Sequence, residues 1–142
     1  MTVALIDDQL VSSVLRGATP NSLGDAELYT TGYWYVRLCQ AVLSASERAG
    51  TLSRPFAALP GELRDRAIQL LLELPEDIGL ISLRDLAPSM GRLRSTSQLN
   101  ILGIEVLAAA KYLGADVFLS ASSPNLEAAL IEEGLAVHVG AG

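Results

Sequence analysis

Two adjacent carboxylates, Asp7 and Asp8, directly follow a short apolar run at residues 3–6. If that run is a strand of a parallel sheet, both carboxylates lie past its carboxyl end, where such sheets bind ligands. A hard cation such as Mg²⁺ takes one or two carboxylates there and keeps its remaining waters, and metal-bound water can hydrolyse a phosphodiester. The structural alternative is that either aspartate caps the helix that follows, over residues 9–16. Both interpretations stay open, and helix capping is the simpler one.

The elements that must position these groups follow from apolar patterning and turn residues. Residues 3–6 are typical of a buried strand, and further strands are expected at 80–83, 115–120 and 135–139. Helices are expected at 9–16, 30–50, 62–74, 85–93 and 123–134, and a further helix should begin after Ser97 or Asn100 and run to 113. Gly17, Gly114 and Gly134 are the expected helix ends. Candidate N-caps for the later helices are Thr30 or Thr31, Ser97 or Asn100, and Ser123. Residues 17–25 read as a loop.

This alternation of strands and helices favours a parallel sheet with helices on both faces. We predict a single α/β domain over residues 1–142 with three α/β/α layers. Its sheet should be short and mostly parallel, with about four strands and a Rossmann-like topology. Four stretches would then meet at the carboxyl rim of the strands: residues 7–8, 84–85, 120–122 and the tail after 139.

The charge balance limits the choice of partners. Ten Lys and Arg face 16 Asp and Glu, for a net charge of −6. An acidic chain repels a phosphate backbone unless its basic residues cluster. Arg84, Arg92 and Arg94 form the one local concentration of basic residues in the sequence. A solvated loop is the alternative, and we find no DNA-specific motif.

The high apolar content points to an additional buried surface. Half of the residues are hydrophobic and the mean hydropathy is +0.36, which fits strands buried on both faces or a surface covered by a second subunit. We expect a homodimer that uses the aromatic segment YTTGYWYVRL, residues 29–38, because Tyr and Trp are favoured as interface anchors. Packing of this segment into the chain's own core is the alternative.

No membrane span and no secretory signal are expected. Charged residues such as Arg37, Glu105 and Asp116 interrupt the apolar stretches well short of the ~20 residues that cross a bilayer. The N-terminus lacks a basic segment ahead of an apolar one. The single cysteine, Cys39, excludes an internal disulfide and suits a reducing cytosol. We therefore predict a cytoplasmic location.

Three segments together resemble a PIN domain, and the resemblance covers almost the whole chain. VALIDDQLVSSVL is similar to the opening strand with its first aspartate, placed at Asp7 with Asp8 as the alternative. GIEVLAAAKYLGADVFLS is similar to the penultimate helix and following strand, and LEAALIEEGLAVHV to the closing helix and strand. The resemblance implies the fold of many metal-dependent ribonucleases, including the toxins of toxin–antitoxin pairs.

Three of the four acids that the resemblance implies are missing from their expected positions. The second would fall near Arg37, and Glu47 is the nearest acid, nearly three helical turns further on. The third would fall at Gly103, whereas Glu105 lies two positions later, roughly 200° round a regular helix. The fourth would fall at Ser122, whose hydroxyl is a poor replacement for a carboxylate.

We therefore expect a PIN-like domain with an incomplete acidic site that acts as a non-catalytic binding or interaction module. In this interpretation Glu105 pairs with Arg37 or with an arginine near residues 92–94, because a carboxylate in so apolar a helix needs a partner. The rival hypothesis is a Mg²⁺- or Mn²⁺-dependent ribonuclease. It would use Asp7, Asp8 and Glu105 for catalysis, Asp7 and Asp8 as metal ligands, and Arg92 and Arg94 to hold RNA.

Overall fold

The computed structural model describes residues 2–44 and 50–140 of the chain. Within these ranges it contains five strands: β1 (Val3–Ile6), β2 (Glu27–Thr30), β3 (Ile78–Leu80), β4 (Asp116–Leu119) and β5 (Val137–Val139). The helices are α1 (Asp8–Leu15), α2 (Gly32–Leu43), α3 (Arg54–Ala57), α4 (Gly61–Leu72), α5 (Leu83–Arg94), α6 (Ile101–Leu113) and α7 (Pro124–Glu132). A 3₁₀ turn, η1, covers Asn21–Leu23.

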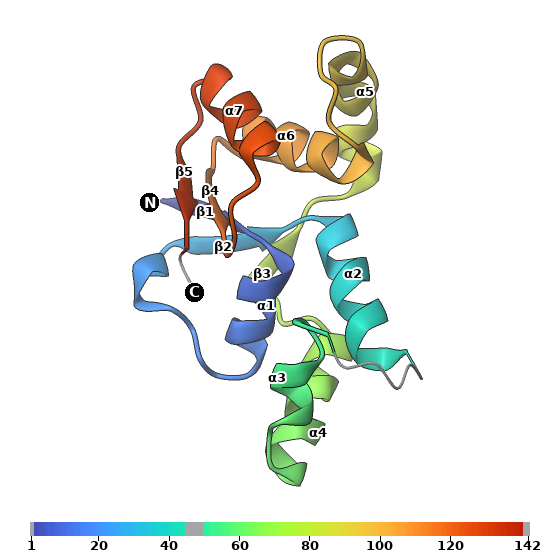
Figure 1. The fold of residues 1–142 in the computed structure, drawn as a ribbon, viewed down its shortest axis with the longest axis vertical. Coiled ribbons are helices and arrows are strands. Elements are labelled where there is room, and N and C mark those ends of the chain that lie inside the picture. The colour runs from blue at the N-terminus through green and yellow to red at the C-terminus, as the bar shows by residue number, and fades with distance from the viewer. Residues whose placement is uncertain (1, 45–49, 141–142) are drawn as a thin grey trace.

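All five strands are parallel and form one sheet in the order β3-β2-β1-β4-β5 (Figure 1). The first strand is therefore the central one: Leu5 lies opposite Tyr29 of β2 on one side and Val117 of β4 on the other. Because the strands run the same way, their carboxyl ends share one edge. Residues that follow β1 and β4, such as Asp7 and Ser120, meet in the middle of that edge.

The expected parallel α/β sheet is confirmed, but the expected number of about four strands is too low. The additional strand, β2, lies between the expected loop at 17–25 and the expected helix start at Thr30 or Thr31. Its residues Glu-Leu-Tyr-Thr are not a continuous apolar run, so the sequence pattern does not indicate a strand there. Its pairing with β1 stabilises it, and Thr30 Oγ1 donates a hydrogen bond to the Ile6 carbonyl at 2.8 Å.

Three of the predicted elements differ in their bounds. β3 covers 78–80 rather than 80–83, because Ser82 accepts a hydrogen bond from the Arg84 N–H and so begins α5. The predicted short helix at 85–93 is longer and covers 83–94. α2 ends at Leu43, and the expected continuation over 45–49, including Glu47, falls outside the described residues.

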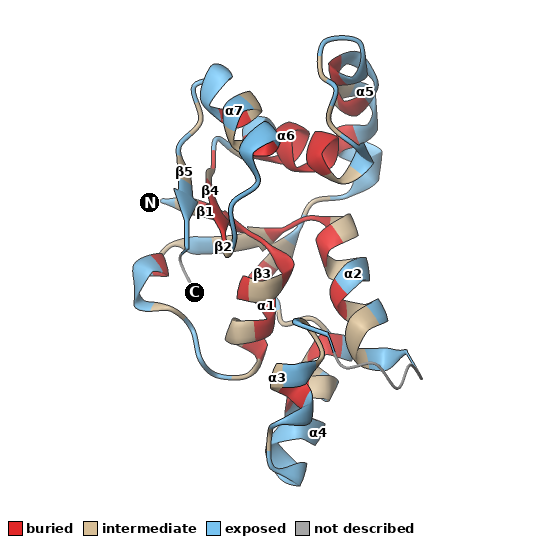
Figure 2. Ribbon diagram, in the orientation of Figure 1, coloured by how far each residue is buried: buried red, intermediate tan, exposed pale blue. Residues whose placement is uncertain are grey.

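The core lies on both faces of the sheet. Successive residues of a strand point to opposite faces, and Leu5 packs into one cluster with Leu107 of α6 while Ile6 packs into another with Leu38 of α2. Figure 2 shows α6 as the most continuously buried helix, whereas α4 is largely exposed. Within the described ranges, no helix is both long and apolar enough to cross a membrane.

Candidate functional site

Asp7 is held by three hydrogen bonds at the junction of β1 and α1. Its Oδ1 accepts from the Leu10 N–H at 3.0 Å, which makes Asp7 the N-cap of α1. The same oxygen accepts from the Ser120 hydroxyl at 2.9 Å, and Oδ2 accepts from the Ser120 N–H at 2.7 Å. The capping role is thus confirmed for Asp7 rather than Asp8. Ser120, which the sequence placed at the same rim without assigning it a role, ties the end of β4 to this carboxylate.

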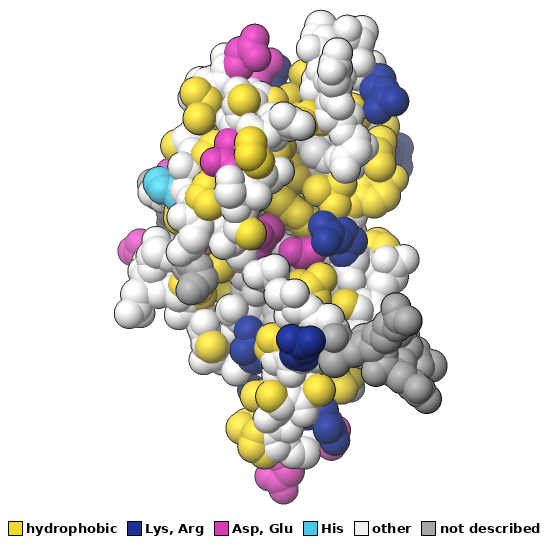
Figure 3. Space-filling model, viewed as in Figure 1, with side chains coloured by type: hydrophobic (Ala, Val, Ile, Leu, Met, Phe, Trp, Pro, Cys, Tyr) yellow, Lys and Arg dark blue, Asp and Glu magenta, His cyan; other side chains and the backbone are white. Residues whose placement is uncertain are grey.

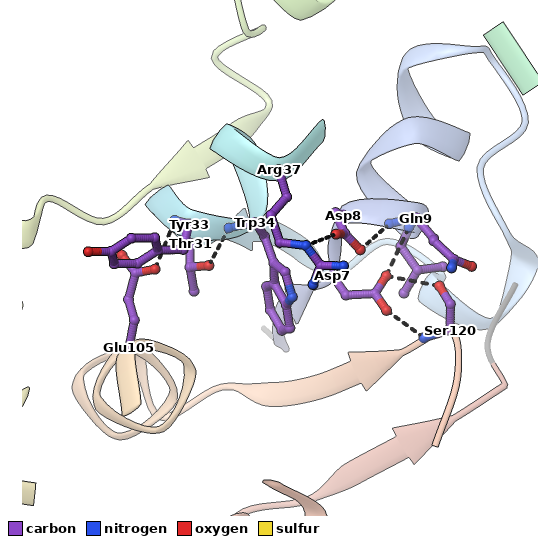
Figure 4. A network of polar contacts seen from close by, with 10 residues as sticks. Asp7, Asp8, Gln9, Thr31, Tyr33, Trp34, Arg37, Glu105 and Ser120 are labelled. Atoms are coloured by element: carbon purple, nitrogen blue, oxygen red, sulfur yellow. Dashed lines mark hydrogen bonds and ion pairs between the residues drawn. The ribbon is translucent and has the colours of Figure 1, made fainter. Parts of the chain in front are cut away.

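Asp8 is buried beside an arginine. Its Oδ1 accepts from the Gln9 N–H at 2.9 Å, and Oδ2 faces Arg37 Nε at 3.5 Å as an ion pair (Figure 4). Oδ2 is the one buried side-chain oxygen or nitrogen without a hydrogen-bond partner among the described residues. Burial raises the pKa of the Asp8 carboxyl, and the nearby Arg37 guanidinium opposes that rise. The Arg37 guanidinium therefore lies next to the Asp8 carboxylate.

The Glu105 carboxylate accepts hydrogen bonds from the N-terminus of α2. Its Oε1 accepts from the Tyr33 N–H at 2.9 Å and its Oε2 from the Gly32 N–H at 3.2 Å. Thr31, the N-cap residue, accepts from the Trp34 N–H at 3.2 Å. A fully buried carboxylate requires such donors, and a negative charge is favoured at a helix N-terminus. The expected pairing of Glu105 with an arginine is wrong, because backbone N–H groups satisfy it.

The three candidate acids are therefore arranged as a pair and a separate residue. Asp7 and Asp8 lie side by side at the start of α1, whereas Glu105 lies on the other side of Trp34 in the view of Figure 4. No group of three or more His, Cys, Asp or Glu placed to hold a metal occurs in residues 2–44 and 50–140. Because Asp7 accepts three hydrogen bonds from the protein and Asp8 faces a cation, a divalent ion would have to compete with these contacts. The role of Asp7 and Asp8 as metal ligands stays a prediction.

The two remaining positions of the implied site have other structural roles. Gly103, in the first turn of α6, donates its N–H to the N-cap residue Asn100 at 2.9 Å. The Ser122 hydroxyl donates to Glu127 Oε2 at 2.9 Å, and the same oxygen accepts from the Ser123 N–H before α7. These contacts stabilise helix starts and leave no carboxylate at either position.

Arg92 and Arg94 lie in the last turn of α5, on a different part of the molecule. Arg92 lines a pocket of about 330 Å³ with Lys111 and Tyr112, and that pocket includes neither Asp7 nor Asp8. Arg94 donates to the Leu99 carbonyl at 3.4 Å. Both guanidinium groups are exposed, and their assignment to RNA binding stays a prediction.

Charges of both signs meet near the centre of one face of the molecule, where acidic side chains lie next to a basic one (Figure 3). The carboxylates of Asp7, Asp8 and Glu105 are engaged within the chain, by helix N–H groups, by Ser120 and by Arg37. Such a site can hold its own elements together and present a polar edge to a ligand. No protein-family model matches the chain, and no curated protein matches it.

Proposed function

We propose that this chain is a PIN-like domain that acts as a non-catalytic binding or interaction module. One observation carries the proposal: the Asp7 carboxylate accepts three hydrogen bonds from protein donors. A divalent ion at this position would have to compete with these donors, and with the Arg37 guanidinium at Asp8. A hydrolytic site instead needs open ligands that support the attacking water and the developing charge.

The fold supports the family assignment in a general way. A parallel sheet with a separate apolar cluster on each face is what a three-layer PIN-like domain requires. The residues at the implied acid positions, Arg37, Gly103 and Ser122, each have another partner or role, which supports the loss of catalysis. We also propose a cytoplasmic location, because a chain with a single cysteine forms no internal disulfide.

The proposed interaction surface is one face of α2, and the proposed partner is a second copy of the chain. Trp34 is 4% exposed and packs into the chain's own core, so it does not anchor an interface. Val36 and Leu43 are 48% and 45% exposed. They are two helical turns apart and so share a face. A second subunit covering these side chains would account for part of the high mean hydropathy.

The competing function is a Mg²⁺- or Mn²⁺-dependent ribonuclease built on Asp7, Asp8 and Glu105. Its specific support is Asp8 Oδ2, which has no hydrogen-bond partner among the described residues and lies next to Asp7. Thermal unfolding with and without millimolar Mn²⁺ or Mg²⁺ distinguishes the two functions. A metal at 100 times its dissociation constant stabilises the folded state by about 2.7 kcal/mol. We expect no such stabilisation of the wild type, and no cleavage of RNA.

The variants Asp7→Asn and Asp8→Asn make this test specific. Metal stabilisation of the wild type that both variants lose, together with RNA cleavage, would establish the nuclease instead. The dimer is tested separately by sedimentation velocity. Val36→Asp should dissociate it, whereas the control Leu63→Asp on α4, at a side chain 55% exposed, should not. A monomeric wild type at the highest concentrations studied would contradict the α2 interface.

A further inference from the structure

A polar pocket of about 340 Å³ lies along α1, next to the acidic pair. This volume is within the range of small-molecule sites. Its polar lining comes from α1, the segment before α3 and the residue after β4: Gln9, Ser12, Ser13, Arg16, Thr51 and Ser120. Among the described residues that line it, none is acidic. The pocket therefore combines one cation with several neutral hydrogen-bonding groups.

Arg16 is the charged group of this pocket. Its Nε donates to Ser12 Oγ at 3.1 Å and its Nη2 to Ser13 Oγ at 3.3 Å, so the guanidinium folds back along α1. The ion pairs formed by the described residues do not include Arg16. A guanidinium has five N–H donors, of which these serines use two. Burial also lowers the pKa of Arg16, a cost that a bound anion would offset.

The groups around Arg16 add donors from other directions. Ser12 is 2% exposed, and its hydroxyl accepts from Arg16, which leaves the hydroxyl hydrogen free to be donated. The Gln9 amide and the Thr51 hydroxyl line the same pocket from α1 and from the segment before α3. Hydrogen-bonding groups that line the pocket from separate elements can serve the three terminal oxygens of a tetrahedral oxyanion, whereas the guanidinium alone already matches a planar carboxylate.

Neither of the neighbouring acids lines the pocket, and both have partners elsewhere in the chain. The Asp7 carboxylate accepts its three hydrogen bonds, and Asp8 faces Arg37. A nucleic-acid strand is a poor fit for the pocket, since strand binding needs a row of cations along the backbone. Arg16 is the only Lys or Arg among the described lining residues.

We propose that this pocket binds a small phosphate monoester, with the Arg16 guanidinium as the charged donor and the Ser12 hydroxyl and Gln9 amide as further donors. The site is distinct from the α2 interface and needs neither a metal nor a dimer. It gives the binding module a small-molecule ligand of defined chemistry. Occupation would tie α1 to the segment before α3, since both line the pocket.

Titration calorimetry on the full chain tests the proposal, with glycerol 3-phosphate and inorganic phosphate as probes and glycerol at matched ionic strength as the control. We expect saturable binding of glycerol 3-phosphate to the wild type, at least tenfold weaker in Arg16→Gln. The matched variant Arg64→Gln removes the same charge from an exposed position on α4 and should change the affinity by less than twofold. Arg16→Lys keeps the charge but loses the planar donor pair, and should give an intermediate loss.

Three results would overturn the proposal. The first is no saturable binding of either phosphate probe to the folded wild type at millimolar concentration. The second is an equal loss in Arg16→Gln and Arg64→Gln, which would show unspecific charge attraction. The third is Arg16-dependent binding of a single-stranded RNA that is tighter than binding of glycerol 3-phosphate. If Arg16→Gln does not fold, Ser12→Ala and Arg16→Lys test the proposal instead. Unchanged affinity for glycerol 3-phosphate in both variants would contradict it. Sedimentation velocity of Arg16→Gln measures its oligomeric state, so a loss of phosphate binding is not confused with a loss of the dimer.

Discussion

Glu105 Oε1 accepts a hydrogen bond from the Tyr33 N–H at 2.9 Å, across 72 positions of the chain. With the second bond from Gly32, one buried carboxylate satisfies two of the N–H groups that a helix start leaves without intrahelical partners. This contact joins α6 to the N-terminus of α2 and assigns Glu105 a structural role that does not depend on a metal.

Glu105→Ala should lower the free energy of unfolding by about 3 kcal/mol, because two donors lose a charged acceptor at a fully buried position. Glu105→Gln keeps one acceptor oxygen and should lower it by about 1 kcal/mol. Urea unfolding in metal-free buffer measures both. Glu132→Ala, at an exposed position of α7, is the control and should leave stability unchanged. A Glu105→Ala chain as stable as this control would contradict the capping role.

Gly32→Ala should destabilise the chain although Ala is normally the better helix former. A Cβ at Gly32 would lie 3.2 Å from Glu105 Oε2, so the carboxylate has to shift from its hydrogen bonds. We expect a loss of about 1 kcal/mol. Gly61 occupies the corresponding first position of α4, and a Cβ added there would meet no neighbouring atom within 4 Å. Gly61→Ala should therefore raise stability by about 0.5 kcal/mol, and equal effects at both positions would contradict the explanation.

Asp7→Asn should destabilise the metal-free chain by about 1–3 kcal/mol, because an amide group cannot accept from both the N–H and the hydroxyl of Ser120 while capping α1. Asn is itself a good N-cap, so the loss arises at Ser120. A double-mutant cycle with Ser120→Ala in urea unfolding isolates this contribution, and a coupling energy near zero would refute it. Stabilisation by Asp7→Asn is the result expected of a metal ligand freed from repulsion.

Unlike Asp7→Asn, Asp8→Asn should raise the free energy of unfolding at neutral pH. Burial raises the pKa of Asp8 above its ordinary value of 3.8, so the folded state holds this proton more tightly than the unfolded state. Stability therefore falls as pH rises from 3.8 through the raised pKa. Asn cannot titrate, so the variant should be more stable than the wild type at pH 7, by about 1 kcal/mol.

The advantage of Asp8→Asn should shrink as the pH is lowered through that window, because the wild-type carboxyl becomes neutral as well. Urea unfolding between pH 4 and pH 7 tests this, with Asp65→Asn on the exposed side of α4 as the control. A difference between wild type and Asp8→Asn that is constant with pH would contradict the role of burial. Loss of the Arg37 ion pair acts against the effect, but that pair is long and Arg37 is largely exposed.

Local sequence was enough to predict the parallel α/β class and several of the helix boundaries. Asp7, Thr31 and Asn100, each one of two candidates, cap their helices, and Gly114 ends α6 with a φ of +61°. The expected cap Ser123 is wrong, because its side chain makes no capping hydrogen bond to α7. These features depend on residues within a few positions of one another, where side-chain oxygens reach free N–H groups and glycine adopts left-handed backbone. The alternation of such segments then favours the sheet.

Long-range pairing required the tertiary structure. β2 is a strand because it pairs with β1 and β3, not because of its own pattern. Ser120 reaches Asp7 across 113 positions, and Glu105 meets the N-terminus of α2 rather than an arginine. Which groups meet at the carboxyl edge depends on strand order, and a buried carboxylate takes the donors that this order brings within reach. The spacing of acids along the chain does not encode that choice.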